Sequence, residues 1–431
     1  MKIEHVARDR PLTLKRYGED ENQAFVTESV RNIIQDVRQR GDEAVFAYTK
    51  TFDGADLTDL FVSADEVRSA YERVDCDVVT AIQKAAKNIR EYHGHQQQKS
   101  WMMTREDGTM LGQKVTPLDS AGIYVPGGTA AYPSTILMDT IPALVAGVER
   151  IVMASPPDEN GQLHPAVLVA AAELGIRTIV KAGGAQAIAV LAYGTESIEP
   201  VDKIVGPGNQ FVAAAKREVY GHVDIDMIAG PSEIVVLADE SARADYIAAD
   251  LLSQAEHDVQ ASAILVTNSE ALATQVSEQV ERQLQGLPRE TIARQAISNY
   301  GAIYVTDSIE EAVAVVNTLA PEHLEVLTEQ PFEWLGSIKH AGAIFLGEYS
   351  AEAVGDYFAG TNHVLPTNGT ARFSSPLSVD DFLKKSSVIH YSNKALVDNS
   401  QHITALARVE GFEAHARAVE IRKRKERDDD E

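Results

Sequence analysis

An irregular segment from Gly355 to Thr367, GDYFAGTNHVLPT, carries an acid, an amide and a histidine between glycines. It has neither the helical nor the strand period of a core element. Loops that combine Asp, Asn and His with Gly often hold catalytic or ligand-binding side chains. If the segment is considered alone, a solvated surface loop explains it equally well. The other residues of the chain must therefore show whether Asp356 and His363 have partners.

A second polar segment, SQAEHD, ends a predicted helix and carries Gln254 and His257. The two residues are three positions apart and therefore share one helix face. Together they could form half of a metal site, to which Asp356 would add a hard oxygen ligand. One more histidine would complete a nitrogen and oxygen set suited to zinc. The available histidines are His323, His363, His390, His402 and His415. A polar helix end without a metal is the alternative.

Two further segments place a glutamate close to a histidine. APEHLE carries the adjacent residues Glu322 and His323 between a predicted helix and a predicted strand. The two side chains point in different directions from one turn, so they could transfer protons at one centre. EGFEAH, near the C-terminus, carries Glu410 and His415. Exposed charges on connecting segments would also explain both pairs.

Four glycine-rich turns follow predicted strands. They are PGGTAAYP (126–133), AGGAQA (182–187), VGPGNQF (205–211) and AGPSE (229–233). Glycine after a strand lets backbone N–H groups approach a phosphate in front of the next helix. None of the four is a complete dinucleotide fingerprint, because Phe211 replaces the third glycine of the best one. No convincing acidic partner for a ribose follows about 20 residues later. Four such turns nevertheless favour a ligand cleft over unrelated tight turns.

The elements that must position these segments alternate between strands and helices. Residues 24–50 and 64–98 have helical spacing, and two series of short apolar runs and helices follow from Leu118 and from Ile234. This alternation predicts two parallel α/β units, with a cleft at the carboxyl ends of their strands. Residues 1–22 are polar and irregular. The C-terminal tail is too small to fold alone and must dock on the main body or on a second subunit.

Composition narrows the class of protein. A chain of 431 residues with 44% hydrophobic residues should form more than one domain. The net charge of −25 argues against nucleic-acid binding, which needs a basic face. No apolar run is long enough to span a bilayer, and the N-terminus lacks an apolar signal core. The single cysteine, Cys76, excludes an internal disulfide and a cysteine-rich zinc site. We therefore expect a soluble cytoplasmic protein.

In combination, these motifs resemble those of the histidinol dehydrogenase family, from about Arg31 to about Arg422. The resemblance rests on YVPGGTAAYPST, GGAQAIA, DKIVGPGN, DIDMIAGPSE, LLSQAEHD, APEHLE, GDYFAGTNHVLPT, TARFSSPLSV and EGFEAHA, in the order of the family. It implies two incomplete, Rossmann-like α/β domains with small terminal extensions that form an intertwined homodimer. The expected parts are an N-terminal extension (1–22), a metal-binding and catalytic domain (23–123 with 234–377), an NAD-side domain (124–233) and a dimerisation tail (378–431).

The resemblance also implies an activity, the four-electron oxidation of L-histidinol through L-histidinal to L-histidine. This last step of histidine biosynthesis uses two NAD⁺ in succession and one water. The zinc ligands would be Gln254, His257, Asp356 and the partner subunit's His415. In the family's acid–base pair, His323 serves as the base of each oxidation and Glu322 activates the water.

The resemblance assigns the remaining contacts as well. Ser232, His363 and the partner subunit's Glu410 match substrate-contacting positions, together with the zinc ligands and the acid–base pair. The positions that match NAD contacts are Tyr124, Gln186 and Asn209. Three other functions would use some of the same residues: a zinc hydrolase, a dehydrogenase for another alcohol and a metal-binding scaffold. A hydrolase leaves the glycine turns unexplained, and a scaffold leaves Glu322 and His323 unexplained.

Overall fold

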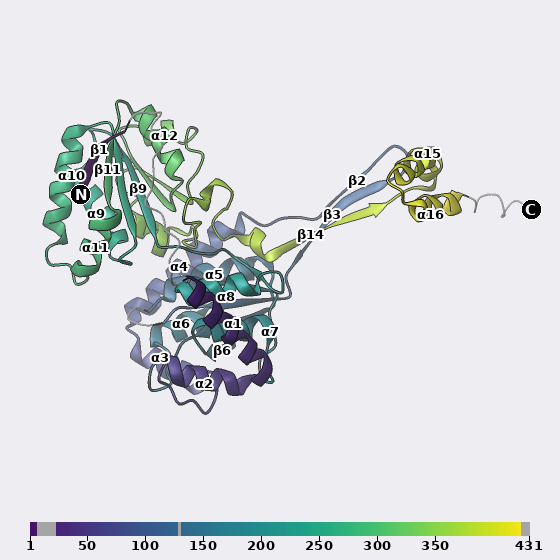
Figure 1. Cartoon of the computed structure of the whole chain (residues 1–431), viewed down its shortest axis with the longest axis horizontal. Coiled ribbons are helices and arrows are strands. Elements are labelled where there is room, and N and C mark those ends of the chain that lie inside the picture. The colour runs from purple at the N-terminus through teal and green to yellow at the C-terminus, as the bar shows by residue number, and fades with distance from the viewer. Residues whose placement is uncertain (7–22, 128–130, 424–431) are drawn as a thin grey trace, which may run out of the picture. The chain divides into compact units, whose positions relative to one another are not determined.

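The computed structural model describes residues 1–6, 23–127 and 131–423 of this mixed α/β chain (Figure 1). The chain divides into two compact units. The first unit contains residues 1–96 and 118–382 and holds two parallel sheets. The second contains residues 97–117 and the chain from residue 383 onward, with one antiparallel sheet. Among the described residues, no helix combines the length and the apolar character needed to cross a membrane.

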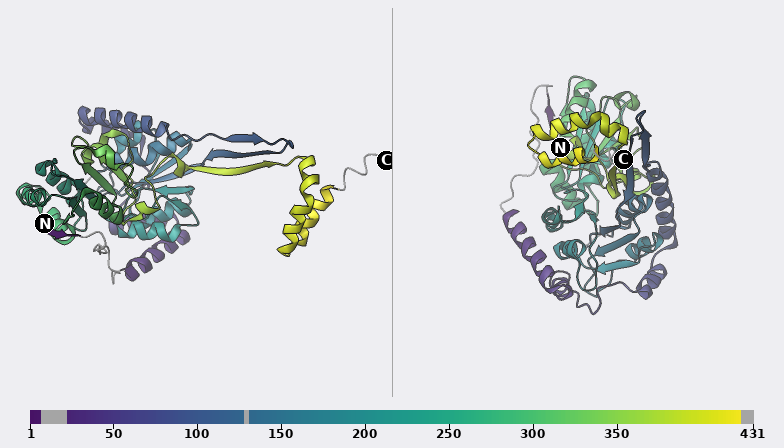
Figure 2. Two further views of the ribbon diagram at one scale, coloured as in Figure 1. Left: turned by 90° about the horizontal axis from the view of Figure 1, so that it is seen from above. Right: turned by 90° about the vertical axis from the view of Figure 1, so that its right-hand side faces the viewer.

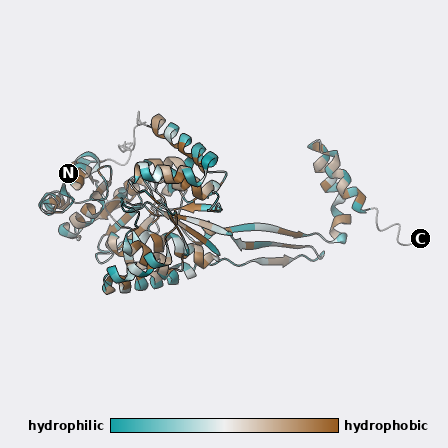
Figure 3. Cartoon of the chain, turned by 90° about the horizontal axis from the view of Figure 1, so that it is seen from below, coloured by the Kyte–Doolittle hydropathy of each residue, from teal (hydrophilic) through white to brown (hydrophobic). Residues whose placement is uncertain are grey.

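A five-stranded parallel sheet forms one lobe of the first unit, in the order β6-β5-β4-β7-β8. Its strands are β4 (Ser120–Tyr124), β5 (Arg150–Ser155), β6 (Thr178–Lys181), β7 (Lys203–Val205) and β8 (Asp224–Ile225). They are joined through α5 (Pro133–Ala146), α6 (Pro165–Glu173), α7 (Gly184–Tyr193) and α8 (Gln210–Val219). The strands are almost entirely buried and apolar, because helices cover a parallel sheet on both faces. Helices of the chain show both brown and teal turns in Figure 3, as amphipathic helices do.

A six-stranded parallel sheet forms the other lobe, in the order β1-β11-β10-β9-β12-β13. Its strands are β1 (Lys2–His5), β9 (Glu233–Ala238), β10 (Ser262–Thr267), β11 (Ala302–Val305), β12 (His323–Leu327) and β13 (Ala343–Leu346). The helices are α9 (Ala244–Ala255), α10 (Glu270–Leu284), α11 (Glu290–Tyr300), α12 (Ile309–Leu319), α13 (Pro331–Trp334) and α14 (Glu352–Val354). Short helices follow at η1 (Gly355–Ala359, a π-helix), η2 (Thr370–Arg372) and η3 (Val379–Phe382).

Both lobes contain the same strand order. When five strands are numbered along the chain within each lobe, β4 to β8 and β9 to β13 both follow the order 3-2-1-4-5. This is a doubly wound arrangement, in which the chain changes direction beside the first strand. In the six-stranded sheet, β1 pairs in parallel with β11 at the outer edge. Part of the predicted irregular N-terminal segment is therefore a strand, while residues 7–22 lie outside the described residues.

The helices of residues 23–94 pack on the five-stranded lobe. They are α1 (Gln23–Arg40), α2 (Asp42–Phe52), α3 (Ala64–Arg73) and α4 (Cys76–Gly94). α1 packs on α7 and α8, α3 on α6, and α4 on α5, since their apolar faces join the core of that lobe. This placement differs from the expected grouping of residues 23–123 with residues 234–377. The strand β4 also belongs to the five-stranded sheet.

The second unit combines three antiparallel strands with a helical hairpin. Its elements are β2 (Trp101–Thr104), β3 (Met110–Pro117), β14 (Leu383–His390), α15 (Asn393–Val409) and α16 (Glu413–Lys423). β14 pairs with β3 along its whole length, as the neighbouring long strands in Figure 2 show. The C-terminal segment therefore completes a sheet with β2 and β3, which the sequence pattern does not predict.

Candidate functional site

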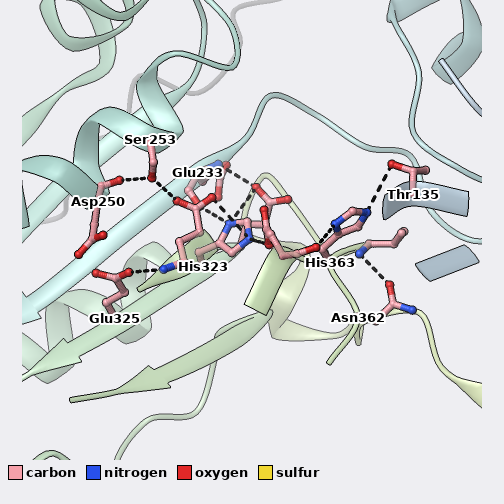
Figure 4. A network of polar contacts seen from close by, with 12 residues as sticks. Thr135, Glu233, Asp250, Ser253, His323, Glu325, Asn362 and His363 are labelled. Carbon is pink, nitrogen blue, oxygen red and sulfur yellow. Dashed lines mark hydrogen bonds and ion pairs between the residues drawn. The ribbon is translucent and has the colours of Figure 1, made fainter. Parts of the chain in front are cut away.

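His323 is the first residue of β12, which pairs with β9 in the six-stranded sheet, and the residue is only 3% exposed. Its Nδ1 lies 3.1 Å from the carbonyl oxygen of Glu233, and its Nε2 lies 3.3 Å from Oδ1 of Asp356. Because a carbonyl and a carboxylate can only accept, both ring nitrogens carry a proton in these contacts, which Figure 4 draws as dashed lines at the labelled His323. The imidazole is thus held in one orientation.

The carboxylate of Glu322 lies on the other side of this imidazole, with Oε2 3.6 Å from Nδ1 of His323. The backbone N–H of Glu233 donates to the same oxygen at 2.8 Å. Burial raises the pKa of Glu322 to about 8. Burial alone would lower the pKa of His323, but the surrounding carboxylates, first Glu322, raise it to about 10. Glu322 and His323, whose pKa values are both raised above their usual ranges, therefore lie in one buried centre.

Gln254 enters the centre from the last turn of α9 and is fully buried. The oxygen and nitrogen of the Gln254 amide are assigned so that both form hydrogen bonds. The nitrogen then donates to Glu352, and the oxygen accepts from the backbone N–H of Glu233. Glu352 also accepts a hydrogen bond of 2.9 Å from the Ser253 hydroxyl. Its own N–H donates to Glu325 at 2.8 Å. Glu352 thus fixes the end of α9 next to His323.

The segment from Gly355 to Thr367 folds back on itself. Asp356 lies in the π-helix η1, an irregularity that often marks functional sites. Nδ1 of His363 lies 3.0 Å from the backbone carbonyl oxygen of Asp356, and its Nε2 lies 3.5 Å from Oγ1 of Thr135. Asn362 donates to the carbonyl oxygen of Met138 in α5. Asp356 and His363 therefore meet between the two lobes of the first unit.

The donor atoms of this centre fit a divalent cation. His323, Glu352 and Asp356 each offer a ligand atom within 4.8 Å of the others. Although burial opposes it, the charge and hydrogen bond of His323 lower the pKa of Asp356, so that residue is an anion. A cation would relieve the repulsion among carboxylates that surround one imidazole, and mixed nitrogen and oxygen donors suit zinc. His257, another of the four predicted ligands, lies two residues beyond the end of α9 and is exposed.

The centre lies at the amino ends of its strands, not at the carboxyl ends as predicted. Glu233 begins β9 and His323 begins β12. The helix α9 leaves the carboxyl end of β9 and returns to the start of β10, so its last turn brings Gln254 to the amino ends. The sequence pattern shows the order of elements but not which edge of the sheet a helix end reaches.

A separate cavity of about 990 Å³ lies in the five-stranded lobe, at the carboxyl ends of its strands as predicted. Tyr124, Gln186 and Asn209 all line it. The Tyr124 hydroxyl accepts a hydrogen bond of 3.1 Å from the N–H of Gly184, and Asn209 caps α8. Gly206 has a φ of 122°, and a side chain there would collide with the carbonyl oxygen of Tyr124. Residues 128–130 of the first glycine turn lie outside the described residues.

Gln186 gives this cavity the character of a ligand site. Its side chain is 1% exposed, yet neither its amide oxygen nor its amide nitrogen has a hydrogen-bond partner among the described residues. Such orphaned polar atoms are rare and call for a ligand or an ordered water. The cavity volume lies at the upper end of the range for small-molecule sites, roughly 300 to 1,000 Å³. Both observations fit a ligand as large as a dinucleotide.

The remaining predicted residues lie apart from these contacts or on the second unit. Ser232 directly precedes β9, and its carbonyl oxygen accepts a bond from Ser262. Glu410 caps the C-terminal end of α15, and His415 lies in the first turns of α16. Both of these side chains are exposed on the second unit.

Glu352 is the main site residue that sequence reasoning misses. It precedes Asp356 by four positions, a spacing that puts two carboxylates on one helix face. That spacing is a usable signal, but the surrounding letters SAEAVG resemble an ordinary helix start. Glu233 and Thr135 contribute through contacts distant in the chain, for which no local pattern exists.

Two doubly wound lobes, a dinucleotide-sized cavity and a buried histidine–carboxylate centre are typical of α/β oxidoreductases. The histidinol dehydrogenase family model matches residues 15–423, and the chain belongs to this family. It is 65% identical to the histidinol dehydrogenase of Halalkalibacterium halodurans, over 93% of this chain and 94% of that protein. It is 62% identical to that of Bacillus licheniformis, over 99% of this chain and 100% of the relative.

The fold is also found in a solved structure. The crystal structure of histidinol dehydrogenase from Elizabethkingia anophelis superimposes with a TM-score of 0.93 and 41% sequence identity. The match covers 98% of each chain. The fold of the whole chain, including both sheets of the first unit, is therefore that of the family.

Proposed function

We propose that this protein catalyses the zinc-dependent, NAD-linked oxidation of L-histidinol through L-histidinal to L-histidine, the final step of L-histidine biosynthesis. Family membership supports the proposal. The observation that carries it is the buried contact between Nε2 of His323 and the carboxylate of Asp356. This contact sets a proton-transfer group beside a proposed metal ligand, which is the arrangement that an alcohol oxidation at a metal-held substrate requires.

Gln254, His257 and Asp356 are the residues that would hold zinc, with the partner subunit's His415 as the fourth ligand. The surplus of buried carboxylates around His323 supports a divalent cation here. When bound, zinc would fix the substrate through its nitrogen atoms and stabilise negative charge on its oxygen. Ser232, His363 and the partner subunit's Glu410 would contact the substrate as well.

A bound cation would neutralise the charges of Glu352 and Asp356, which raise the pKa of His323. With that pKa lowered, Nε2 of His323 would take the proton of the alcohol oxygen in the first oxidation. The bond between Nδ1 and the Glu233 carbonyl keeps Nε2 directed at the substrate. NAD, when bound, would accept a hydride from the same carbon in each of the two oxidations. The alcohol thereby loses one proton and one hydride and becomes the aldehyde.

In the second half, His323 would first release the proton of the first oxidation to solvent. Glu322 would then take a proton from water as the water oxygen bonds to the aldehyde carbon, which gives the singly ionised hydrate. The raised pKa of the buried Glu322 makes it a stronger base than an exposed carboxylate. His323 would then take a hydroxyl proton of the hydrate while the second hydride leaves. The products are the carboxylate of L-histidine and two reduced cofactors.

Tyr124, Gln186 and Asn209 would contact NAD in the 990 Å³ cavity that they line. The partnerless amide of Gln186 supports a polar ligand there. The strand order 3-2-1-4-5 in each lobe supports the interpretation of both as Rossmann-like domains. Because the reaction draws on NAD, we propose a cytoplasmic location.

An intertwined homodimer is the proposed assembly, with residues 378–431 as its dimerisation tail. The second unit exposes several large apolar side chains, which a second copy of the chain would cover. They are Trp101, Met102, Met103, Ile389, Leu406, Val409, Phe412 and Ile421. A shared site would explain why Glu410 and His415 lie on this unit.

The test is the formation of NADH from L-histidinol by the purified protein, followed by ultraviolet absorbance. We expect two NADH per histidinol, loss of activity after chelation and recovery with zinc. Asp356→Ala should abolish the recovery, whereas Glu348→Ala, at an exposed position, should keep it. A zinc hydrolase would produce no NADH, and that result would refute the proposal.

A further inference from the structure

One acidic side chain at the proposed NAD cavity is half-buried, and one of its carboxylate oxygens has no hydrogen-bond partner among the described residues. Asp53 directly follows α2, and its backbone N–H caps that helix through the carbonyl of Thr49. The side chain lines the cavity, and its Oδ2 is buried without a hydrogen bond from any described residue. Burial raises the pKa of Asp53 to about 6. A buried carboxylate oxygen of this kind is costly unless a ligand supplies a donor.

Asp53 and Tyr124 line the same cavity. After the larger effect of burial, the charge of Asp53 contributes to raising the pKa of the Tyr124 phenol to about 12. The Tyr124 hydroxyl itself reaches the N–H of Gly184, which follows β6. Tyr124 ends β4, the first strand of the sheet, and β6 is the third. In a doubly wound sheet, the half formed by strands one to three holds the adenosine end of a dinucleotide.

An acid that binds the ribose usually follows the second strand of the sheet, and here that position is occupied by an aspartate with other hydrogen-bond partners. There Asp158 follows β5 closely, but its Oδ1 accepts the N–H groups of Asn160 and Gln162, both at 2.9 Å. Asp158 also lines the cavity, but its Oδ1 stabilises a turn. Asp53 follows the helix α2, which precedes the glycine turns in the chain and packs on the same lobe. The usual spacing of about 20 residues after a glycine turn therefore does not point to it.

We propose that Asp53 accepts hydrogen bonds from the adenosine ribose hydroxyls of NAD and repels the 2′-phosphate of NADP. The inference rests on the proposed function. A carboxylate can accept from a diol, whereas a phosphate at the same place would put two anions in contact. Asp53 would then determine which dinucleotide the enzyme uses. Arg73 also lines the cavity, and its guanidinium donates a hydrogen bond to the side-chain oxygen of Gln162.

The test compares the dissociation constants of NADH and NADPH, measured by calorimetry on the whole protein. We expect the wild type to prefer NADH, and Asp53→Asn to reduce that preference at least about tenfold, mainly by tighter NADPH binding. The matched control is Asp56→Asn, three residues further on, where the exposed carboxylate pairs with Lys50 at 2.8 Å. This control should leave the preference unchanged.

A second measurement needs no variant. NADH that lacks the 2′-hydroxyl of the adenosine ribose should bind the wild type several-fold more weakly than NADH. Equal binding of the two, or an unchanged preference in Asp53→Asn, would overturn the role of Asp53. Wild-type protein that binds NADPH as tightly as NADH would also overturn it, while leaving the proposed function intact. Failure to bind NADH at all would instead refute the proposed function.

Discussion

Nε2 of His323 lies 3.3 Å from the carboxylate of Asp356, although 33 positions separate the two residues in the chain. His323 is the first residue of the buried strand β12, and Asp356 lies in the π-helix η1 outside the sheet. The contact forms because the segment after β13 folds back over the amino ends of the strands. The contact connects the proposed acid–base pair with the proposed metal ligands. Substitutions in the pair should therefore affect proton transfer, whereas substitutions among the ligands and their neighbours should affect zinc binding.

Glu322→Gln should slow the second oxidation much more than the first. The amide cannot take a proton from water, so aldehyde oxidation should fall by roughly 10²-fold or more. Single-turnover measurements that start from L-histidinol and from L-histidinal separate the two steps. The exposed Glu329→Gln, just beyond the carboxyl end of β12, serves as control. Equal slowing of both steps would contradict the assignment of Glu322 to hydration.

Glu352→Ala should weaken zinc binding by about 10- to 100-fold, the usual effect of losing a residue that orients a ligand. The change removes the acceptor of the Gln254 amide nitrogen, and the amide oxygen is then no longer fixed. Competition with a chromogenic chelator measures the affinity without any turnover. Glu348→Ala, an exposed position four residues earlier, should bind zinc like the wild type. Unchanged affinity in Glu352→Ala would rule out this positioning role.

Mixing two inactive variants should restore activity if the site is shared. His415→Ala and Asp356→Ala each destroy every site in their own homodimer. A heterodimer keeps one intact site, so random exchange should recover about a quarter of the wild-type activity. The measurement requires verified subunit exchange, for instance by mass spectrometry. If exchanged mixtures stay inactive, both ligands must come from one chain or serve elsewhere.

The sequence predicts most of the elements, because buried parallel strands and amphipathic helices leave strong local periods. It also predicts that Asp356 and His363 act together, since both lie in one irregular segment that a short fold-back can close. The glycine turns indicate the cavity, because only glycine permits the close approach of Gly206 to Tyr124.

Other features depend on contacts that no local period encodes. β1 is four residues long and polar, and it becomes a strand only by pairing with β11. The pattern of helices α1 to α4 does not show which lobe buries their apolar faces. Asp53 lines the same cavity as Tyr124 only through that packing, and Glu352 reaches Gln254 only because α9 ends at the amino edge of the sheet.

Gln186→Leu should have opposite effects on stability and binding. In the free protein, the change removes a buried amide that has no hydrogen-bond partner among the described residues, so the free energy of unfolding should rise by about 1 kcal/mol. NADH should bind roughly tenfold more weakly, because the leucine cannot hydrogen-bond the ligand. Urea unfolding and calorimetry measure the two quantities, with the exposed Gln275→Leu as control. Loss of stability in Gln186→Leu would show that the amide has a partner in the free protein.

Asp53 should make the stability of the ligand-free protein depend on pH. Its pKa is raised from 3.8 to about 6 in the folded state, so the folded protein holds this proton more tightly than the unfolded chain. Its contribution to stability is therefore complete below about pH 4 and is lost as the pH rises through about 6. The full shift corresponds to about 3 kcal/mol, but solvent screening of a half-buried group leaves about 1 kcal/mol.

Asp53→Asn cannot ionise, so above pH 6 it should be more stable than the wild type by about that 1 kcal/mol, with no advantage below about pH 4. Urea unfolding across this range measures the difference. The exposed Asp56→Asn should follow the wild type at every pH. Saturating NAD should reduce the advantage, because ribose hydroxyls that donate to the carboxylate stabilise its ionised form. Parallel curves for Asp53→Asn and wild type would show that the carboxylate is solvated rather than held for a ligand.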